Sequence, residues 1–236
     1  MYILMYVIYY LGCVVLIMFL SNGITCFFIF NHINQFIKSI FPSWDQPKRQ
    51  IVLSTAHAIF TSIISSLYLY NILSEFVYYH LISIAFGFAL YDIGQILAIR
   101  NHLWKQMLFH HLMIIAALCP FVYYSFTNRL PIESYPYFIA MNYLVEFATI
   151  PLNISWYLHN TKNTECVLFK VTSIFTLILY LPFRVINTGY LTFYSMLYLP
   201  HIVPLQEIQL VFFVMNIFWF YKLCKKVKSL KTKKID

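Results

Sequence analysis

The sequence contains few charged residues, and this scarcity excludes a soluble globular protein. Only 10% of its 236 residues are Asp, Glu, Lys or Arg, whereas roughly a quarter are charged in a typical soluble domain. Apolar residues make up 61% of the chain, and its mean hydropathy is +0.72. No polar stretch is long enough to form a separate soluble domain. The composition is that of a polytopic membrane protein.

Cysteine is scarce as well, and its spacing excludes the common metal and disulfide motifs. The five cysteines form no Cys-x-x-Cys pair. Four of them lie within or beside apolar runs, where cysteine behaves as a small hydrophobic residue and a disulfide framework is not expected. The cysteines therefore indicate no metal site, and no tightly bound cofactor is expected. The cysteines are Cys13, Cys26, Cys119, Cys166 and Cys224.

Acidic residues are outnumbered by basic residues, and the basic excess lies mainly at one end. The chain has 8 Asp and Glu against 16 Lys and Arg, which gives a net charge of +8. Seven of the lysines lie in residues 222–236. A basic tail directly after an apolar run is a topology signal and attracts anionic lipid head groups. Nucleic acid is not expected as a partner, because the rest of the chain is suited to lipid.

Seven apolar runs are long enough to span a membrane, at roughly 20 residues per span. They cover about residues 1–30, 51–70, 81–99, 107–126, 137–158, 166–190 and 205–221. The first run lacks a positively charged start, so we expect a span there and not a cleavable signal peptide. Residues 32–49 are expected to form a polar hinge and residues 71–80 a short loop. We divide the chain into a first span with its hinge (1–47), a six-span domain (48–228) and a basic tail (229–236).

The basic residues between the runs predict how the spans are oriented. If the lysine tail is cytoplasmic, three further polar segments fall on the same side of the membrane. These segments carry Lys38, Lys48, Arg49, Arg100, Lys105 and Lys162. The opposite loops hold only Arg129, beside Glu75 and Glu133. This is the asymmetry of the positive-inside rule. We therefore expect an all-α bundle of about seven transmembrane helices, with the N-terminus outside and the C-terminus in the cytoplasm.

Ionisable and amide side chains lie inside the apolar runs at nearly one depth. At about 1.5 Å per helical residue, they lie roughly 5–10 Å from the cytoplasmic end of each span. They are His57, Asp92, His110, His111, Asn153 and Asn216. Lipid offers these groups no hydrogen-bond partner, so we expect them to face one polar chamber near the cytoplasmic side. Glu146 lies deeper, and Arg184 lies near the far face, where it is expected to pair with a carboxylate or extend to the interface.

Asp92, His110 and His111 form the candidate catalytic group. Ionisable groups are costly inside a membrane, and three of them are expensive to keep for packing alone. Adjacent helical residues point about 100° apart, so both imidazoles cannot address one atom. We expect one imidazole to act as a base and the other to orient the substrate or polarise a carbonyl. Asp92 would hold an imidazole in the required tautomer. Such a group activates an amine or hydroxyl against an acyl carbonyl.

Structural roles are the alternative for the other polar groups. His57 alone is expected to be a hydrogen-bonded structural histidine, and Asn153 and Asn216 are expected to join helices. The adjacent histidines are a weak metal site, because they do not share one helix face as the His pair of a zinc protease does. A small channel or transporter is a weaker hypothesis, since the sequence has no ring of like charges and no paired interrupted helices.

Six short motifs resemble the TLC superfamily, the membrane domain shared by ceramide synthases, translocation-associated proteins and small TLC-domain proteins. They occur in the family's order between about residues 48 and 228. They are STAH at 54–57, YD at 91–92, FHH at 109–111, YLVEFATIPLNISWYL at 143–158, FRV at 183–185 and MNIFW at 215–219. The ordered set is most similar to the small TLC domain-containing proteins of the type 4 kind.

The resemblance implies a seven-helix bundle around a cavity for a long acyl chain, in the endoplasmic reticulum or another endomembrane. In ceramide synthases the paired histidines, here His110 and His111, are the catalytic positions, and acyl-CoA is the co-substrate. Those enzymes also carry paired aspartates, whereas this chain has Glu146 and Asn153 in the comparable helix.

Two functions are therefore expected for the chain. The first is a lipid acyltransferase-like enzyme that uses acyl-CoA and whose partners are membrane lipids. The second is a non-enzymatic lipid-binding protein that regulates membrane composition. For either function, the candidate substrate-binding residues are His57, Glu146, Asn153, Arg184 and Asn216.

Overall fold

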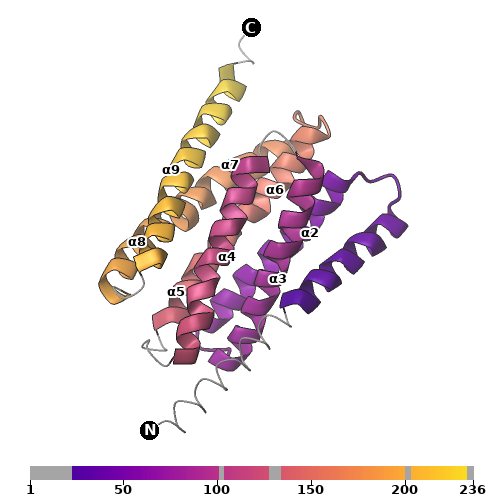
Figure 1. Cartoon of the computed structure of the whole chain (residues 1–236). Helices are drawn as coiled ribbons and strands as arrows, with labels where there is room; N and C mark the ends of the chain where they lie inside the picture. Colours follow the sequence, from indigo (N-terminus) through magenta and orange to yellow (C-terminus); the bar gives the residue numbers. More distant parts are fainter. Residues whose placement is uncertain (1–22, 101–103, 128–133, 200–202, 233–236) are drawn as a thin grey trace, which may run out of the picture. The chain divides into compact units, whose positions relative to one another are not determined.

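The computed structural model of the chain is helical throughout the part that it describes (Figure 1). It describes residues 23–100, 104–127, 134–199 and 203–232, and no strand occurs among them. The predicted all-α class is thus confirmed, while most of the predicted first span lies outside the described residues. The chain divides into two compact units. Unit 1 comprises Met1–Leu53 and Ile64–Ala140, and unit 2 comprises Ser54–Ile63 and Met141–Asp236.

Four of the described helical segments are long and apolar enough to cross a membrane. They are Gln46–Leu69, Ile82–Ile99, Val167–Tyr198 and Pro204–Lys228. They correspond to the second, third, sixth and seventh predicted spans. The helices at the fourth and fifth predicted spans are not among them. The third of these segments has 32 residues, which is more than a membrane of ordinary thickness requires.

Unit 1 contains a helix at residues 23–40, both ends of α2 (Gln46–Leu69), α3 (Glu75–Ile99) and α4 (Trp104–Thr127). The middle of α2, Ser54–Ile63, belongs to unit 2. The Asp45 carboxylate accepts a hydrogen bond of 3.0 Å from the Lys48 backbone N–H, and it thereby caps the start of α2. Ser74 caps α3 in the same way through the Val77 N–H. Helices α3 and α4 pack against each other (Figure 1).

Two glycines allow the first described helix and α3 to approach closely. A Cβ atom on Gly87 would lie 2.5 Å from the Gly23 carbonyl oxygen and 2.5 Å from Cys26 Cβ. A Cβ atom on Gly23 would lie 2.5 Å from the Phe86 ring. Small residues at helix crossings are typical of membrane proteins, where close van der Waals packing holds helices together. Gly23 and Gly87 therefore allow these two helices to pack at close distance.

Unit 2 contains α6 (Glu146–Asn160), α7 (Val167–Tyr180), the π-helix η1 (Leu181–Ile186), α8 (Asn187–Tyr198) and α9 (Val203–Thr232). Helices α6 and α7 pack as one hairpin, and α8 and α9 as another (Figure 1). Small buried hydroxyls join the helices, as in the 2.9 Å hydrogen bond from Ser155 Oγ to Thr172 Oγ1. Such side chains satisfy one another where lipid cannot.

The predicted fifth span is interrupted by a short break. Two residues, 144 and 145, separate the end of helix α5 (Ser134–Tyr143) from the start of α6. Around the break the backbone bonds close tighter turns, from the Leu144 N–H to the Met141 carbonyl and from the Ala148 N–H to the Val145 carbonyl, each at 3.2 Å. A hydrogen bond from the N–H of one residue to the carbonyl three residues earlier closes a 3₁₀ turn. Such turns within a helix often mark a hinge. The sequence did not predict this break.

Two predicted polar connections are mostly helical, so their predicted boundaries were wrong. The expected hinge at 32–49 contains the end of the helix at 23–40, and only residues 41–45 separate it from α2. The expected loop at 71–80 ends at Ser74, because the Ser74 cap starts α3 there. Polar side chains such as Lys and Gln are good helix formers, so a hydropathy pattern alone ends these helices too early.

The last two predicted spans extend further than expected. The sixth span continues through η1 and α8 to Tyr198. The seventh continues to Thr232, so the first residues of the predicted basic tail at 229–236 are helical. Lysine supports this extension for two reasons. It is a good helix former, and a cation at the C-terminal end of a helix is favoured by the helix dipole.

Candidate functional site

The structure brings Asp92 of α3 and His111 of α4 into direct contact. The distance from His111 Nε2 to Asp92 Oδ2 is 2.8 Å, and the two side chains are only 12% and 5% exposed. Each residue lies seven positions from the end of its helix at the α3–α4 connection, which is about 10 Å along the axis. The two residues that the sequence placed at one depth on neighbouring helices therefore form a buried pair in unit 1.

The second ring nitrogen of His111 defines how many protons the pair holds. His111 Nδ1 lies 2.9 Å from the Met107 carbonyl oxygen, one helical turn earlier. A carbonyl only accepts, so Nδ1 must carry a proton. The short contact to Asp92 needs a second proton, either on Nε2 or on the carboxyl group. In both forms the pair holds two protons and has no net charge, which is the least costly state for burial.

Gln50 of α2 completes the surroundings of Asp92. Its Nε2 donates a 2.7 Å hydrogen bond to Asp92 Oδ1, so both carboxylate oxygens have a partner. One turn earlier, Gln46 Nε2 donates to Gln95 Oε1 at 2.6 Å. These two bonds align the start of α2 with the end of α3. Three helices of unit 1 thus converge on one buried carboxylate.

His110 lies beside the pair but points elsewhere. The rings of His110 and His111 are perpendicular, with an interplanar angle of 88° and a centroid separation of 5.4 Å. The expectation that adjacent histidines cannot address one atom agrees with this geometry. Both ring nitrogens of His111 are engaged by Met107 and Asp92, and the ring of His110 is turned at a right angle to that of His111.

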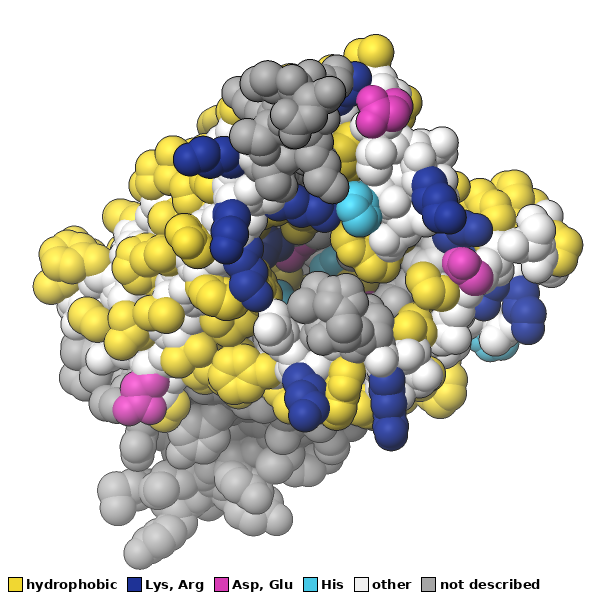
Figure 2. Space-filling view, turned by 90° about the horizontal axis from the view of Figure 1, so that it is seen from above, with side chains coloured by type: hydrophobic (Ala, Val, Ile, Leu, Met, Phe, Trp, Pro, Cys, Tyr) yellow, Lys and Arg dark blue, Asp and Glu magenta, His cyan; other side chains and the backbone are white. Residues whose placement is uncertain are grey.

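The end of unit 1 nearest this site is basic. Lys48 lies in the first turn of α2, and Arg100 and Lys105 flank the α3–α4 connection. Figure 2 shows how lysine and arginine side chains of the chain lie at its surface among hydrophobic ones. A basic surface above a buried site attracts anionic substrates.

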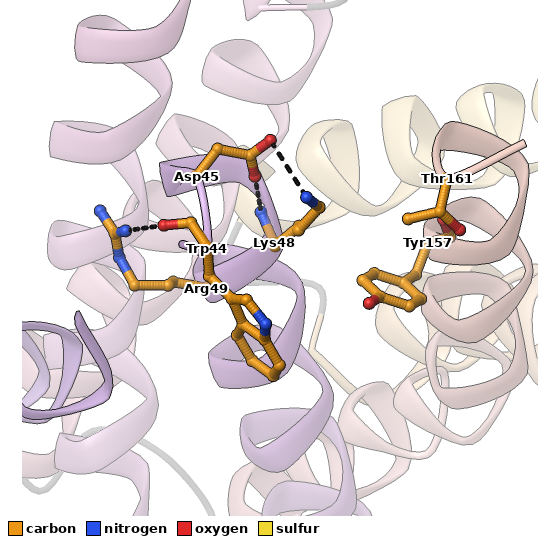
Figure 3. Close-up of polar contacts among 6 residues, drawn as sticks. All are labelled: Trp44, Asp45, Lys48, Arg49, Tyr157 and Thr161. Carbon is orange, nitrogen blue, oxygen red and sulfur yellow. Dashed lines mark hydrogen bonds and ion pairs between the residues drawn. The ribbon is translucent and has the colours of Figure 1, made fainter. Parts of the chain in front are cut away.

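Arg49 has a structural role at this end. Its Nε donates to Asn34 Oδ1 at 3.2 Å. Its Nη1 donates to the Trp44 carbonyl oxygen (Figure 3). The side chain is only 9% exposed. Arg49 therefore joins the helix at 23–40 to the start of α2 by hydrogen bonds. The neighbouring Lys48 pairs with Asp45 at 3.7 Å instead (Figure 3).

The other predicted site residues all belong to unit 2. Asn153 Nδ2 donates to Ser54 Oγ at 3.1 Å, and Asn216 Oδ1 accepts from the Tyr180 hydroxyl at 3.3 Å. Both amides therefore join helices, as their structural interpretation predicts. His57 lies within α2, and its carbonyl oxygen accepts from Thr61 Oγ1 at 2.8 Å. Glu146 is the first residue of α6.

Arg184 lies in η1 and is 6% exposed. Its Nη2 donates to Thr149 Oγ1 at 2.5 Å, and its Cζ lies 5.4 Å from the Tyr180 ring centroid. A carboxylate partner was one of the two alternatives expected for Arg184, yet within the residues described no Asp or Glu forms an ion pair with it. A hydroxyl and an aromatic ring contact the guanidinium there.

Sequence reasoning missed Gln50 and Thr149. Gln46 and Gln50 are one turn apart on α2, and their partners Gln95 and Asp92 are three residues apart on α3. Matching polar residues at helical spacing on two runs is a signal that could have paired these helices. Thr149 gives no comparable signal, because a threonine in an apolar run commonly bonds its own backbone.

Comparisons of the chain with protein-family models, with curated proteins and with solved structures found no match. In the part of the chain that the structure describes, no group of three or more His, Cys, Asp and Glu residues could hold a metal ion. The function must therefore be argued from the geometry of the buried groups.

Proposed function

We propose that this chain is a multi-pass membrane protein that acts on lipids, with Asp92, His110 and His111 at the centre of an acyl-transfer site. The observation that carries the proposal is the buried contact of 2.8 Å between His111 Nε2 and Asp92 Oδ2, directly beside a second histidine. Ionisable groups in membrane helices are costly and mark functional sites by default. The ordered TLC-like motifs support the same reaction class.

The hydrogen bonds support different roles for the two histidines. His111 is a positioning residue, because both of its ring nitrogens are engaged by Met107 and Asp92. His110 is the candidate general base. It would remove the proton from an acceptor hydroxyl or amine as that atom attacks the thioester carbonyl of an acyl-CoA. The new acyl bond forms, the carbon–sulfur bond breaks, and the proton passes to the leaving CoA thiolate.

The charge of unit 1 is consistent with acyl-CoA as the acyl donor. Coenzyme A carries several phosphate charges, and the basic residues Lys48, Arg100 and Lys105 lie at the end nearest Asp92 and His111. Basic side chains at a site entrance raise the local concentration of an anionic substrate. The acyl chain would then enter the apolar part of the protein while the nucleotide stays in water.

The proposed arrangement has seven transmembrane helices, with the N-terminus outside and the C-terminus cytoplasmic in an endomembrane. The four apolar helices support a membrane setting. The distribution of basic residues supports the orientation, since the lysine-rich end of α9 and the basic end of unit 1 would both face the cytoplasm.

The test of this function is untargeted lipidomics of cells that express the wild type or the His110→Ala/His111→Ala double variant at matched protein level. An exposed histidine, His32, provides the control variant His32→Ala. We expect a lipid class that rises with the wild type and the control but not with the double variant. Identical lipid profiles for all three proteins would contradict the enzymatic proposal.

A non-enzymatic lipid-binding protein is the second candidate, and one observation favours it. Both oxygens of Asp92 and both ring nitrogens of His111 have hydrogen-bond partners within the protein. A fully satisfied polar network stabilises a specific helix packing without any chemistry. Purified protein that carries intact lipid but leaves lipidomic profiles unchanged would support this candidate over the enzyme.

A further inference from the structure

Unit 2 contains a buried cation whose charge the described residues do not pair. Arg184 is 6% exposed and lies in the apolar helical segment Val167–Tyr198. Its Nη2 donates to Thr149 Oγ1, while its Nε is buried and has no hydrogen-bond partner within the described residues. An arginine in a membrane segment is costly unless an anion or several acceptors surround it. One hydroxyl satisfies only part of a guanidinium that has five N–H donors.

Two irregular helical segments meet at this arginine. Arg184 itself lies in the π-helix η1, and Thr149 lies in the first turns of α6, just after the α5–α6 break. From the next residue after η1, Asn187 Nδ2 donates to the Met141 carbonyl oxygen at 2.7 Å, on the other side of the break. Arg184 and Asn187 thus contact both sides of the interrupted helix. π-helical turns and interrupted membrane helices both occur frequently at ligand sites.

The start of α6 adds further positive potential at the break. The residue before it, Val145, provides no side-chain cap for the first backbone N–H groups of α6. The Phe147 and Ala148 N–H groups bond the Leu144 and Val145 carbonyl oxygens, each at 3.2 Å. The positive potential at this end therefore comes from the helix dipole, which favours an anion near the N-terminus. Glu146 supplies one carboxylate in the first turn, but it forms no ion pair with Arg184 among the described residues. At the end of α5, the buried Tyr143 hydroxyl has no hydrogen-bond partner within the described residues.

We propose that Arg184 and the start of α6 form a site for the phosphate head group of an anionic membrane lipid. The planar guanidinium donates paired hydrogen bonds that match a phosphate or another oxyanion. On the same π-helix, Leu181 and Ile186 are 42% and 60% exposed, which provides an apolar surface for the acyl chains. The inference rests on the proposed lipid-handling function, and it adds a lipid class and a residue that recognises the head group.

The experiment measures lipid binding to the purified full-length protein in a neutral detergent. Labelled dioleoyl phosphatidic acid is the probe, and labelled dioleoylglycerol, which has the same chains without phosphate, is the neutral comparison. We expect the wild type to bind the phosphatidic acid about tenfold more tightly than the diacylglycerol, which corresponds to one or two charge-assisted hydrogen bonds. Arg184→Gln is expected to remove this preference, and the variant Lys170→Gln, which removes an exposed cation of α7, is expected to keep it.

Two further variants and one competitor keep the test decisive. If Arg184→Gln does not fold, Arg184→Lys is the substitute, and it should reduce the preference because a lysine lacks the paired donors. Thr149→Val is expected to leave the preference in place, since the arginine charge remains. Inorganic phosphate is expected to compete weakly. If it displaced the lipid at equal concentration, the lipid assignment would be overturned in favour of the free ion.

The outcomes separate this inference from the proposed function. Equal binding of both lipids by the wild type would overturn the anion site and leave lipid handling in place. A preference for phosphatidic acid that survives in Arg184→Gln, or that is undiminished in Arg184→Lys, would also overturn the site. Binding of neither lipid would contradict both the site and the lipid-handling function.

Discussion

His111 on α4 and Asp92 on α3 form a buried pair with a separation of 2.8 Å between Nε2 and Oδ2. Removing one partner leaves the other as a buried, unmatched polar group. We expect His111→Leu and Asp92→Leu each to destabilise the protein by roughly 3–5 kcal/mol. The double variant should lose much less than the sum of the two, and thermal unfolding of the purified variants in detergent measures this coupling.

An exposed carboxylate in the same unit provides the control for the pair. Asp45 lies 3.7 Å from Lys48 with its side chain 60% exposed. Asp45→Asn keeps a residue that can cap α2, so it should cost less than about 1 kcal/mol. Strictly additive losses in the double variant of Asp92 and His111 would show that the two side chains do not stabilise each other.

The contact between Gly23 and Gly87 predicts a position-specific effect of alanine. A Cβ atom on Gly87 would meet the Gly23 carbonyl oxygen at 2.5 Å, whereas a Cβ atom on Gly94, also in α3, meets nothing within 4 Å. Gly87→Ala should therefore destabilise the protein by about 1–3 kcal/mol. Gly94→Ala should be neutral or slightly stabilising, because alanine favours helices. Unfolding temperatures that fall equally for both variants would contradict the close helix crossing.

The hydrogen bond between Asn153 and Ser54 joins α6 to α2 within unit 2 at 3.1 Å. Hydrogen bonds between membrane helices contribute modestly, so Asn153→Ala and Ser54→Ala should show a coupling energy of about 0.6 kcal/mol. Asn163→Ala, which removes an exposed amide, should have no measurable effect. A double-mutant cycle, measured by unfolding in detergent, gives the coupling energy. A coupling energy of zero would show that this hydrogen bond does not stabilise the protein.

The proposed seven-span topology predicts which loops a membrane-impermeant maleimide reaches. In a variant without the native cysteines, Asn71→Cys in the α2–α3 loop should be labelled from the non-cytoplasmic side. Lys162→Cys in the α6–α7 loop should react only from the cytoplasmic side. Both positions adopt positive φ in tight turns, with values of 58° and 59°. Labelling of both cysteines from one side would contradict the proposed number of spans between them.

The depth of the central pair could be predicted from the sequence, because helical rise is constant. Asp92 and His111 lie equally far from the connection between their helices, so an antiparallel hairpin brings them level. Gln50 was not predicted, because it lies between the expected hinge at 32–49 and the apolar run that begins at residue 51. In the structure α2 begins at Gln46, five residues before that run.

The surroundings of Arg184 could not be predicted for a different reason. Hydropathy shows which residues are apolar but not which carbonyl each backbone N–H selects. The 3₁₀ turns before α6 and the π-helix η1 are both changes of hydrogen-bond register within apolar sequence. These changes set the orientation of the helical segments, so that Arg184 contacts Thr149 and Asn187 contacts Met141. The prolines in these helices, Pro151 and Pro182, mark places where a regular bond is missing without specifying what replaces it.

The most direct test of the proposed reaction uses the purified protein in vesicles that contain a total lipid extract. Labelled palmitoyl-CoA is added, and the label that enters lipid is followed over time. The wild type should transfer label to a lipid acceptor. His110→Ala should lower the rate by at least about a hundredfold, as expected for loss of a general base, while His32→Ala should match the wild type. Equal incorporation by wild type and His110→Ala, or none by the wild type in folded form, would contradict the acyl-transfer account.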